Sequence, residues 1–401
     1  MASAPVWFNA RTYPLLPVAT WFPILPAPWD KWFFGAMLLA LVFAGWSYRR
    51  AVILFLSASL FAFCEDENRG QPWFYMYWVM LLLTLFPAPA PVAACRLAMS
   101  AVYLWSGIQK RQPRFFQVVP EWFVAPATNW HLPSFAIDLL HWAVAAVPFV
   151  EIAIGLALWV PRGRRPAILV VAALHLGALV FLSPLGHNYN WVVWPWNLAM
   201  VALICALFTT GKFWQRSATD TASPSAPKLP PRKARGSASR KSGAAPGLGI
   251  GFAQTLAELR KCKPALIILA LYSLLPILSF TGKWDSDFSF SLYSENVAVA
   301  NVFVTKAFGE RLPMPLQRYV QPFRQDYDPQ RQGPCTFGFQ AWCYEDLHVP
   351  PIPEPRNFRC IFNFLRAYSR QPEDLRMMVG TRGGPVIFYQ GDNVEVLEPA
   401  R

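Results

Sequence analysis

The sequence is poor in charged residues, which argues against a freely soluble protein. Of its 401 residues 15% are charged, whereas soluble domains usually carry about 25%. Hydrophobic residues make up 54% of the chain, and its mean hydropathy is positive. Eighteen Trp and 31 Phe residues supply side chains of the kind that gathers at headgroup depth. We therefore expect an integral protein of the cell or inner membrane, in contact with the lipid bilayer.

Several recognisable signals are also missing. The first 30 residues lack a basic start followed by an apolar run, so no cleavable signal peptide is expected. Segment 1–30 is instead predicted to be a proline-broken aromatic segment lying on the membrane surface. The seven cysteines show no CxxC or Cys/His metal spacing. No internal repeat supports a transporter.

The net charge of +13 does not predict a nucleic-acid partner, because the positive charges concentrate in one linker and a few short loops. Basic loops next to membrane spans set orientation and favour anionic headgroups. Arg49–Arg50, 162–165 and 212–263 should therefore face the cytoplasm.

Eight apolar stretches predict an all-α polytopic bundle of about seven or eight transmembrane helices, because a span needs about 20 residues. The stretches are 32–48, 51–64, 73–91, 93–108, 138–160, 167–183, 191–208 and 264–282. Pro87, Pro89 and Pro91 mark either a turn between two spans or a kink in one broken helix.

The chain is predicted to divide into five parts. They are the interfacial segment 1–30, a transmembrane core 31–210, a disordered basic cytoplasmic linker 211–263, a last transmembrane helix 264–282 and an extracytoplasmic C-terminal domain 283–401. Alternation of residue types in 288–304 and the run Val386–Tyr389 predict strands. The C-terminal domain is thus expected to be small and α+β or β-rich.

Three polar breaks, Glu65–Arg69, Gln109–Arg111 and His187–Asn190, lie next to apolar, aromatic stretches, where polar groups are costly to desolvate and usually functional. With eight spans they share the extracytoplasmic face. The first candidate is Lys110, which follows Gly107 at a helix end. A desolvated lysine can act as a base, whereas the alternative is that its ammonium group snorkels to the headgroups.

The acidic break offers partners for that lysine. Asp66 or Glu67 could pair with Lys110 or Arg111 and take part in catalysis, and Asn68, Arg69 and Trp105 are candidate binding residues. The alternative is a solvated loop.

The third break combines an imidazole with side-chain amides. His187 could exchange a proton near neutral pH. Four further residues are candidate contacts for a carbonyl- or quinone-like headgroup: Asn188, Asn190, Trp194 and Asn197. Asn190 and Asn197 have the alternative of capping and joining helices.

Inside the spans, Glu151 and His175 are predicted to face the bundle interior and to form an intramembrane polar pair, either structural or a proton relay. In the tail, Cys335 and Cys343 are close enough in sequence for a disulfide on an oxidising face.

These residues resemble motifs of the membrane domain shared by the vitamin K-dependent gamma-carboxylase and its bacterial relatives, the HTTM superfamily, with DoxX-like proteins nearby. The similar stretches are Asn68–Trp73, Ser106–Lys110, Glu151 and His175. The resemblance implies a helical bundle with an extracytoplasmic pocket for an isoprenoid quinone and a lysine base at Lys110. Gln109 replaces a lysine of the family motif and no histidine lies near Asn68, so glutamate carboxylation is not expected.

Two functions follow as hypotheses. The first is a redox enzyme or accessory subunit that uses a quinone-like isoprenoid lipid as cofactor or substrate. The second is a non-catalytic scaffold that presents the C-terminal domain to an extracytoplasmic protein partner.

Overall fold

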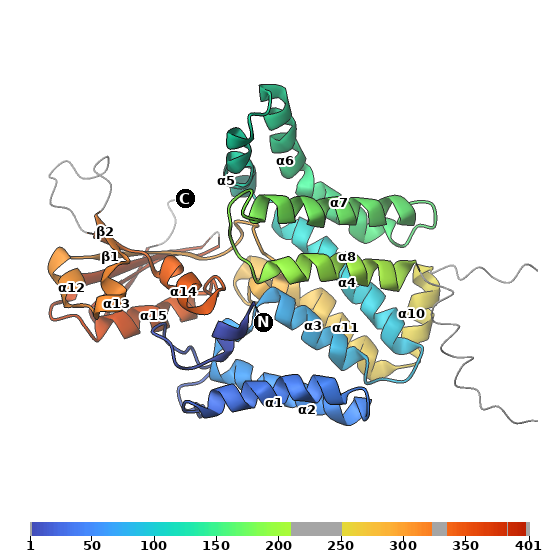
Figure 1. Ribbon diagram of the computed structural model, residues 1–401, viewed down its shortest axis with the longest axis horizontal. Helices are drawn as coiled ribbons and strands as arrows, with labels where there is room; N and C mark the ends of the chain where they lie inside the picture. The colour runs from blue at the N-terminus through green and yellow to red at the C-terminus, as the bar shows by residue number, and fades with distance from the viewer. Residues whose placement is uncertain (1, 210–250, 323–334, 383, 398–401) are drawn as a thin grey trace, which may run out of the picture.

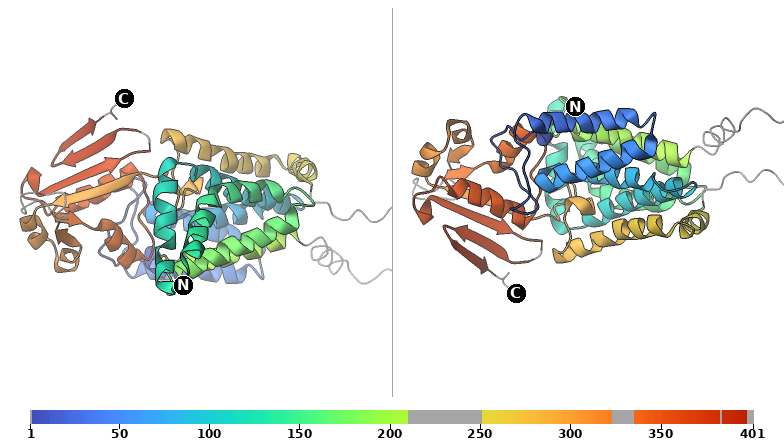
Figure 2. Two further views of the ribbon diagram at one scale, coloured as in Figure 1. Left: turned by 90° about the horizontal axis from the view of Figure 1, so that it is seen from above. Right: turned by 90° about the horizontal axis from the view of Figure 1, so that it is seen from below.

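A bundle of apolar helices and a small mixed domain at one of its ends make up the protein (Figure 1). The computed structural model describes residues 2–209, 251–322, 335–382 and 384–397. Most helices of the bundle run along the long axis of the molecule in the views from above and below (Figure 2), whereas α5 lies across it (Figure 1).

Each predicted apolar stretch contains a helix. The bundle is built from α1 (Trp29–Phe43), α2 (Tyr48–Glu65), α3 (Pro72–Leu83), α4 (Ala90–Gln109), α5 (Pro113–Val124), α6 (Ser134–Ala157), α7 (Arg164–Leu182), α8 (Val193–Phe208), α10 (Phe252–Arg260) and α11 (Lys263–Leu274), which continues as the 3-10 helix Leu275–Thr281. Among the described residues, four helices are long and apolar enough to cross a membrane: Ala90–Gln109, Ser134–Ala157, Arg164–Leu182 and Lys263–Thr281. The helices Pro72–Leu83 and Val193–Phe208 are apolar but shorter.

The proline cluster between α3 and α4 forms a turn. Helix α3 ends at Leu83 and α4 begins at Ala90, so the kinked single helix is ruled out. The start of α3 and the end of α4 both contact the segments that lead into the C-terminal domain: Gln71 Nε2 donates to Pro350 O and Asn296 Nδ2 donates to Gln109 Oε1. The two helices are therefore antiparallel.

The prediction that the linker 211–263 is disordered is wrong for its last part. Residues 252–260 form α10, which packs on α4. Leu259 is buried and Phe252 meets the ring of Trp159 at the end of α6. The basic composition of the linker gave no indication of this short amphipathic helix, whose apolar side chains pack on α4. The remainder of the predicted linker, 211–250, lies outside the described residues.

The first half of the N-terminal segment packs inside the molecule, contrary to the predicted position on the membrane surface, whereas Trp21, Ile24 and Trp29 of the second half are exposed. Trp7 stacks on Phe34 of α1, and Tyr13 meets Trp342 of the C-terminal domain edge to face. Arg11 forms a buried ion pair with Asp66 at 2.7 Å. These aromatic anchors therefore fill the junction between the bundle and the domain.

The C-terminal domain is an antiparallel sheet with helices on one face, and this is the small sheet that the sequence predicts. The strand order is β2 (Val320–Pro322), β3 (Cys335–Phe337), β1 (Val299–Val304), β4 (Leu375–Gly380), β5 (Val386–Gln390) and β6 (Asn393–Leu397). The helices are α12 (Lys306–Arg311), α13 (Met314–Gln317), α14 (Phe339–Leu347) and α15 (Pro355–Arg366). Alternate residues of β1 and β4 enter a shared core with α14 and α15. Residues 288–298, which were predicted to continue β1, instead contain a 3-10 turn at Asp287–Ser289.

The three polar breaks lie at one end of the bundle, the end that carries the C-terminal domain (Figure 1). Three contacts tie them to that domain or to the segment that leads into it: Glu67–Arg356, Arg114–Glu295 and Asn190–Tyr344. Phe208 and Phe252, which lie close to the two ends of the gap in the described residues, are at the opposite end of the bundle, where both rings meet Trp159.

Candidate functional site

Two glycines allow α4 and α6 to approach closely. A Cβ on Gly107 would lie 2.5 Å from Pro148 O and 2.9 Å from Ile152 N, both on the backbone of α6. A Cβ on Gly155 of α6 would lie 2.7 Å from Leu104 Cγ. Close backbone approach at small residues is how helices commonly associate in membranes. It brings the last turn of α4 against the middle of α6.

That approach places Lys110 against Glu151. Lys110 Nζ lies 2.9 Å from Glu151 Oε2 and 3.1 Å from Oε1, and both side chains are about 8% exposed. Ser106, one helical turn before Lys110, accepts a hydrogen bond from Nζ and donates one to Glu151 Oε1 at 3.1 Å. A buried charge is tolerable when it is paired and hydrogen-bonded. The ammonium group is thus neutralised inside the bundle and does not snorkel to the headgroups.

His175 of α7 belongs to a separate hydrogen-bonded chain. Asn197 Nδ2 donates to the Val193 carbonyl at 2.8 Å, which directs Asn197 Oδ1 toward His175 Nδ1 at 2.7 Å. Nδ1 therefore carries the proton, and Nε2 accepts from the Tyr103 hydroxyl at 2.8 Å. The predicted direct pair of His175 with Glu151 is wrong, because a tyrosine from α4 and an amide from α8 satisfy both ring nitrogens.

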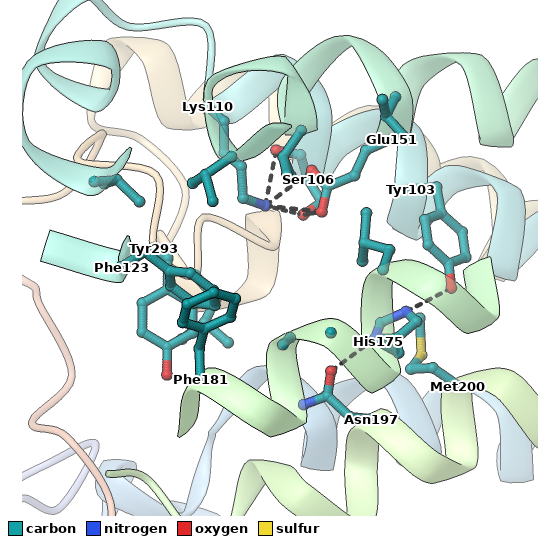
Figure 3. A pocket seen from close by; sticks show the side chains of 18 of the residues that line it. Tyr103, Ser106, Lys110, Phe123, Glu151, His175, Phe181, Asn197, Met200 and Tyr293 are labelled. Carbon is teal, nitrogen blue, oxygen red and sulfur yellow. Dashed lines mark hydrogen bonds and ion pairs between the residues drawn. The ribbon is translucent and has the colours of Figure 1, made fainter. Parts of the chain in front are cut away.

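Both polar groups line one cavity of about 450 Å³ (Figure 3). Lys110, Ser106 and Glu151 lie along one side, and the Tyr103–His175–Asn197 chain lies along another. The remaining wall is mainly Val, Leu, Ala and Phe side chains from α5, α6 and α7. Tyr293, from the segment that follows α11, also lines it. An apolar cavity with a few convergent polar groups is the usual form of a small-molecule site.

The predicted pairing of Lys110 with Asp66 or Glu67 is wrong. Asp66 accepts from Arg11 and from the backbone N–H of Leu16 at 3.2 Å. Glu67 pairs with Arg356 of the C-terminal domain at 2.6 Å. Both carboxylates hold the junction together, and neither lines the cavity around Lys110.

Four candidate binding residues have structural partners instead of cavity positions. Asn68 donates to Asp66 Oδ1, Trp105 Nε1 donates to Ser273 O on α11, and Trp194 Nε1 donates to Tyr189 O. Arg69 is buried and donates to Glu65, Asn9 and three backbone carbonyls, those of Val6, Trp7 and Ala62. Its donors are thus committed to the N-terminal segment and α2.

The His187 break lies beside the cavity. His187 stacks on Trp122 at a ring distance of 4.2 Å and lines a second cavity of about 460 Å³, and Val119 and Tyr293 line both cavities. Asn188 has a positive φ of 49° and donates its backbone N–H to Ser183 O. Asn190 is buried at the junction with the C-terminal domain. Of this group Asn197 alone lines the Lys110 cavity.

Sequence reasoning did not assign roles to Ser106, Tyr103 and Tyr293. Helical spacing could have found the first two, because residues four and seven before Lys110 share its face of α4. Tyr293 carries no local signal, since its position depends on the fold of the segment between α11 and β1.

The cysteines are free thiols. Cys335 lies in β3 and Cys343 is buried in α14, and both are unbonded, so the expected disulfide is absent. Among the described residues, no group of three or more His, Cys, Asp or Glu side chains is placed to hold a metal ion.

Apolar spans around this cavity define an integral membrane protein, and comparison with known families supports that class. Residues 88–189 match the family model described as methylamine utilisation protein MauE, a family of membrane proteins. The match runs from the start of α4 past the end of α7 and includes Lys110, Glu151 and His175. No curated protein and no solved structure matches the chain.

This match corrects the resemblance inferred from the sequence. The motifs around Lys110 and Glu151 belong to a segment that is similar to MauE, not to the HTTM or gamma-carboxylase-like superfamily. These motifs consist of a few residues each, so they did not discriminate between the families.

Proposed function

We propose that the cavity around Lys110 binds a largely apolar small molecule through a polar, hydrogen-bond-accepting end, such as a quinone-like isoprenoid lipid. The observation that carries the proposal is the buried Lys110–Glu151 pair facing an apolar cavity within membrane-length helices. Ionisable groups at that depth are costly and usually functional. The polar end would lie between Lys110 and His175, and the apolar part would lie among the side chains of α5, α6 and α7.

The chemistry at this site would depend on proton donors. Lys110 and Ser106 can donate hydrogen bonds toward a ligand oxygen, and the Glu151 carboxylate balances the charge of Lys110. The hydrogen bonds from Tyr103 and to Asn197 hold the His175 imidazole in one orientation beside the cavity. In an enzyme, Lys110 would be the acid–base group and His175 a positioning residue. His187 would contact molecules in the neighbouring cavity.

We further propose eight spans, α1 to α4, α6 to α8 and α11, within a transmembrane core 31–210 and a last helix 264–282. The domain formed by 283–401 would be extracytoplasmic. The basic turn between α6 and α7 supports this orientation, because it lies away from the C-terminal domain and basic loops stay in the cytoplasm.

Ligand binding tests the proposal directly. The full chain in lipid nanodiscs is titrated with a short-chain benzoquinone, and quenching of tryptophan fluorescence reports the affinity. The double variant Lys110→Met/Glu151→Gln removes both charges together and should weaken binding at least about tenfold, since each lost charged hydrogen bond is worth about 1.5–3 kcal/mol. Leu139→Ala, at a surface position of α6, is the control. If the double variant and the wild type bound the benzoquinone with equal affinity, the Lys110 cavity would not be its binding site.

A scaffold role is the second candidate, and strand β6 favours it. All five residues of β6 are exposed, and it pairs with β5 alone in the described sheet, so one strand edge is open for pairing with a protein partner. Val396→Lys should then remove a partner that is cross-linked to the domain in native membranes, and leave quinone binding unchanged. Retention of the cross-link in that variant would count against the role.

A further inference from the structure

The Lys110 cavity is open on one side. Among the residues that line it, those that are also exposed at the surface are Ala143 of α6 and Val170 and Ala173 of α7. The lining residues that come from α4, α5 and α8 are buried or half-buried. The opening of the cavity therefore lies between α6 and α7.

Pro148 explains why these two helices part from each other. It lies inside α6, where a proline removes one backbone hydrogen bond and bends the helix. In Figure 1 the first half of α6 leans away from α7. Most of the lining residues of α6 precede Pro148, so the half of the helix that leans away is the half that borders the opening.

Small residues border the opening on α7. Ala173 and Gly177 follow Val170 at intervals of three and four residues, so the three positions lie in line along one face of the helix. Gly177 lines the cavity, and a Cβ at this position would meet no atom of the described residues within 4 Å. Gly107 and Gly155 are required by close packing of α4 and α6, whereas packing does not require a glycine at 177. Its missing side chain widens the opening.

The surface around the opening is apolar. Helices α6 and α7 are two of the four described helices that are long and apolar enough to cross a membrane. Leu139 of α6 is 66% exposed and Leu169 of α7 is 71% exposed. A helix that is apolar on its outer side as well as its inner side suits a membrane span. In a bilayer the opening would therefore lead to acyl chains and not to water.

We propose that this opening is a lateral entrance from the bilayer, through which a lipid-dissolved ligand reaches Lys110 and from which its hydrocarbon chain protrudes past Gly177. The inference rests on the proposed function and narrows its ligand class to molecules with one polar end and a long flexible chain. The polar end occupies the cavity of about 450 Å³, whereas the chain needs no room inside it. Chain length is thus not limited by the size of the cavity.

Two ligands with the same ring, methylbenzoquinone and decylbenzoquinone, test the proposal on the full chain in nanodiscs. Gly177→Leu places a side chain in the opening and should weaken the binding of decylbenzoquinone about tenfold, the usual effect of a misplaced methylene group in an apolar pocket. Methylbenzoquinone should bind as it does to the wild type, because its ring stays beside Lys110. Comparing variants for one ligand at a time cancels its partition into the bilayer.

Gly35→Leu in α1 is the matched control, since a Cβ there also meets no atom within 4 Å and the residue does not line the cavity. Leucine favours a helix over glycine, so neither variant should unfold at a lower temperature than the wild type. Equal weakening of both quinones by Gly177→Leu, or weakening of neither, would overturn the proposal.

A second measurement needs no quinone, so failure of the entrance and failure of the proposed function are distinguishable. Gly177→Cys, in a Cys360→Ser background that lacks the exposed thiol, is labelled with the fluorophore bimane. We expect strong quenching by phospholipids that carry a nitroxide on the acyl chain, as for Leu139→Cys on the surface of α6, and little quenching by aqueous iodide. Weak quenching by the lipid, or iodide quenching as strong as for the exposed position Asp392→Cys, would show that the opening does not face the bilayer.

Discussion

At the scale of single residues, the Lys110–Glu151 pair has the largest expected effect on stability. Removing one partner leaves the other charge buried and unpaired, which typically costs about 3–5 kcal/mol. We therefore expect Lys110→Met and Glu151→Gln each to lower the unfolding temperature in detergent markedly. The double variant should be much closer to wild type than the sum of the two losses. Additive losses in this double-mutant cycle would contradict a direct pair.

Asp374 should control acid stability of the C-terminal domain. Burial alone would raise the pKa of its carboxyl, but the N–H groups of Arg370 and Gln371 and the Arg311 guanidinium lower it from 3.8 to about 2. A depressed folded-state pKa stabilises the fold above the ordinary value, and this contribution is lost as pH falls from about 4 to 2. In Asp374→Asn, the free energy of unfolding should therefore depend less on pH between about 4 and 2.

The measurement is chemical unfolding monitored across that pH range. At neutral pH, Asp374→Asn should be less stable by about 1–3 kcal/mol, the cost of losing hydrogen bonds to a charged group. Asp392→Asn, which removes an exposed acid, should follow the wild-type curve. If the free energy of unfolding of Asp374→Asn fell between about pH 4 and 2 as it does in the wild type, this role of the carboxylate would be refuted.

The sequence indicated which residue types were unusual, but it did not identify their partners. Lys110, Glu151 and His175 stood out because ionisable groups in apolar segments are rare. The acids of the break Glu65–Arg69 were assigned to Lys110 because the predicted topology placed both on the same face of the membrane. Their actual partners, Arg11 and Arg356, come from segments 55 and 289 residues away, which no local pattern reports.

At the scale of elements, the crossing of α4 and α6 is set by Gly107. Its substitution by Ala would push a methyl group into the backbone of α6, which cannot yield as a side-chain tip can. Overpacking of this kind costs about 1–3 kcal/mol. Gly107→Ala should therefore lower the unfolding temperature and also weaken quinone binding, because Lys110 moves relative to Glu151.

Gly35→Ala in α1 is the matched control. A Cβ at this position would meet no neighbouring atom within 4 Å, and Ala favours a helix over Gly by about 1 kcal/mol. Its unfolding temperature should be unchanged or higher. An equal loss of stability in both variants would show that the α4–α6 crossing does not govern the effect.

Hydrophobicity predicted the long apolar helices, four of which among the described residues are long enough to cross a membrane, and it predicted the short amphipathic helices poorly. A long apolar run is determined by the bilayer and is visible in composition. Helices α5 and α10 have one apolar face each, which is buried only because a neighbour is present. The C-terminal strand at 386–390 was predicted, whereas residues 288–298 pack beneath the domain with positive φ at Phe290, Tyr293 and Glu295, a conformation that alternation of residue types does not reveal.

At the scale of the whole molecule, the bundle and the domain are held together by the N-terminal segment and by charges. Thr12 and Tyr13 donate to Asp346 of α14, and Arg356 bridges Glu67 and Asp285. These contacts fix the domain over the end that holds Lys110 and His187. The domain and the α6–α7 turn should consequently lie on opposite sides of the membrane.

Cysteine labelling in intact cells tests this orientation. Cys360 is the exposed one of the seven thiols, and burial of part of its side chain raises its pKa, so a membrane-impermeant maleimide is applied at mildly alkaline pH. The wild type should be labelled from outside and Cys360→Ser should not. Arg162→Cys in the Cys360→Ser background should react after permeabilisation alone. Labelling of Arg162→Cys in intact cells would show that the orientation is the reverse of the proposed one. The Lys110 cavity would then lie in the cytoplasmic half of the membrane.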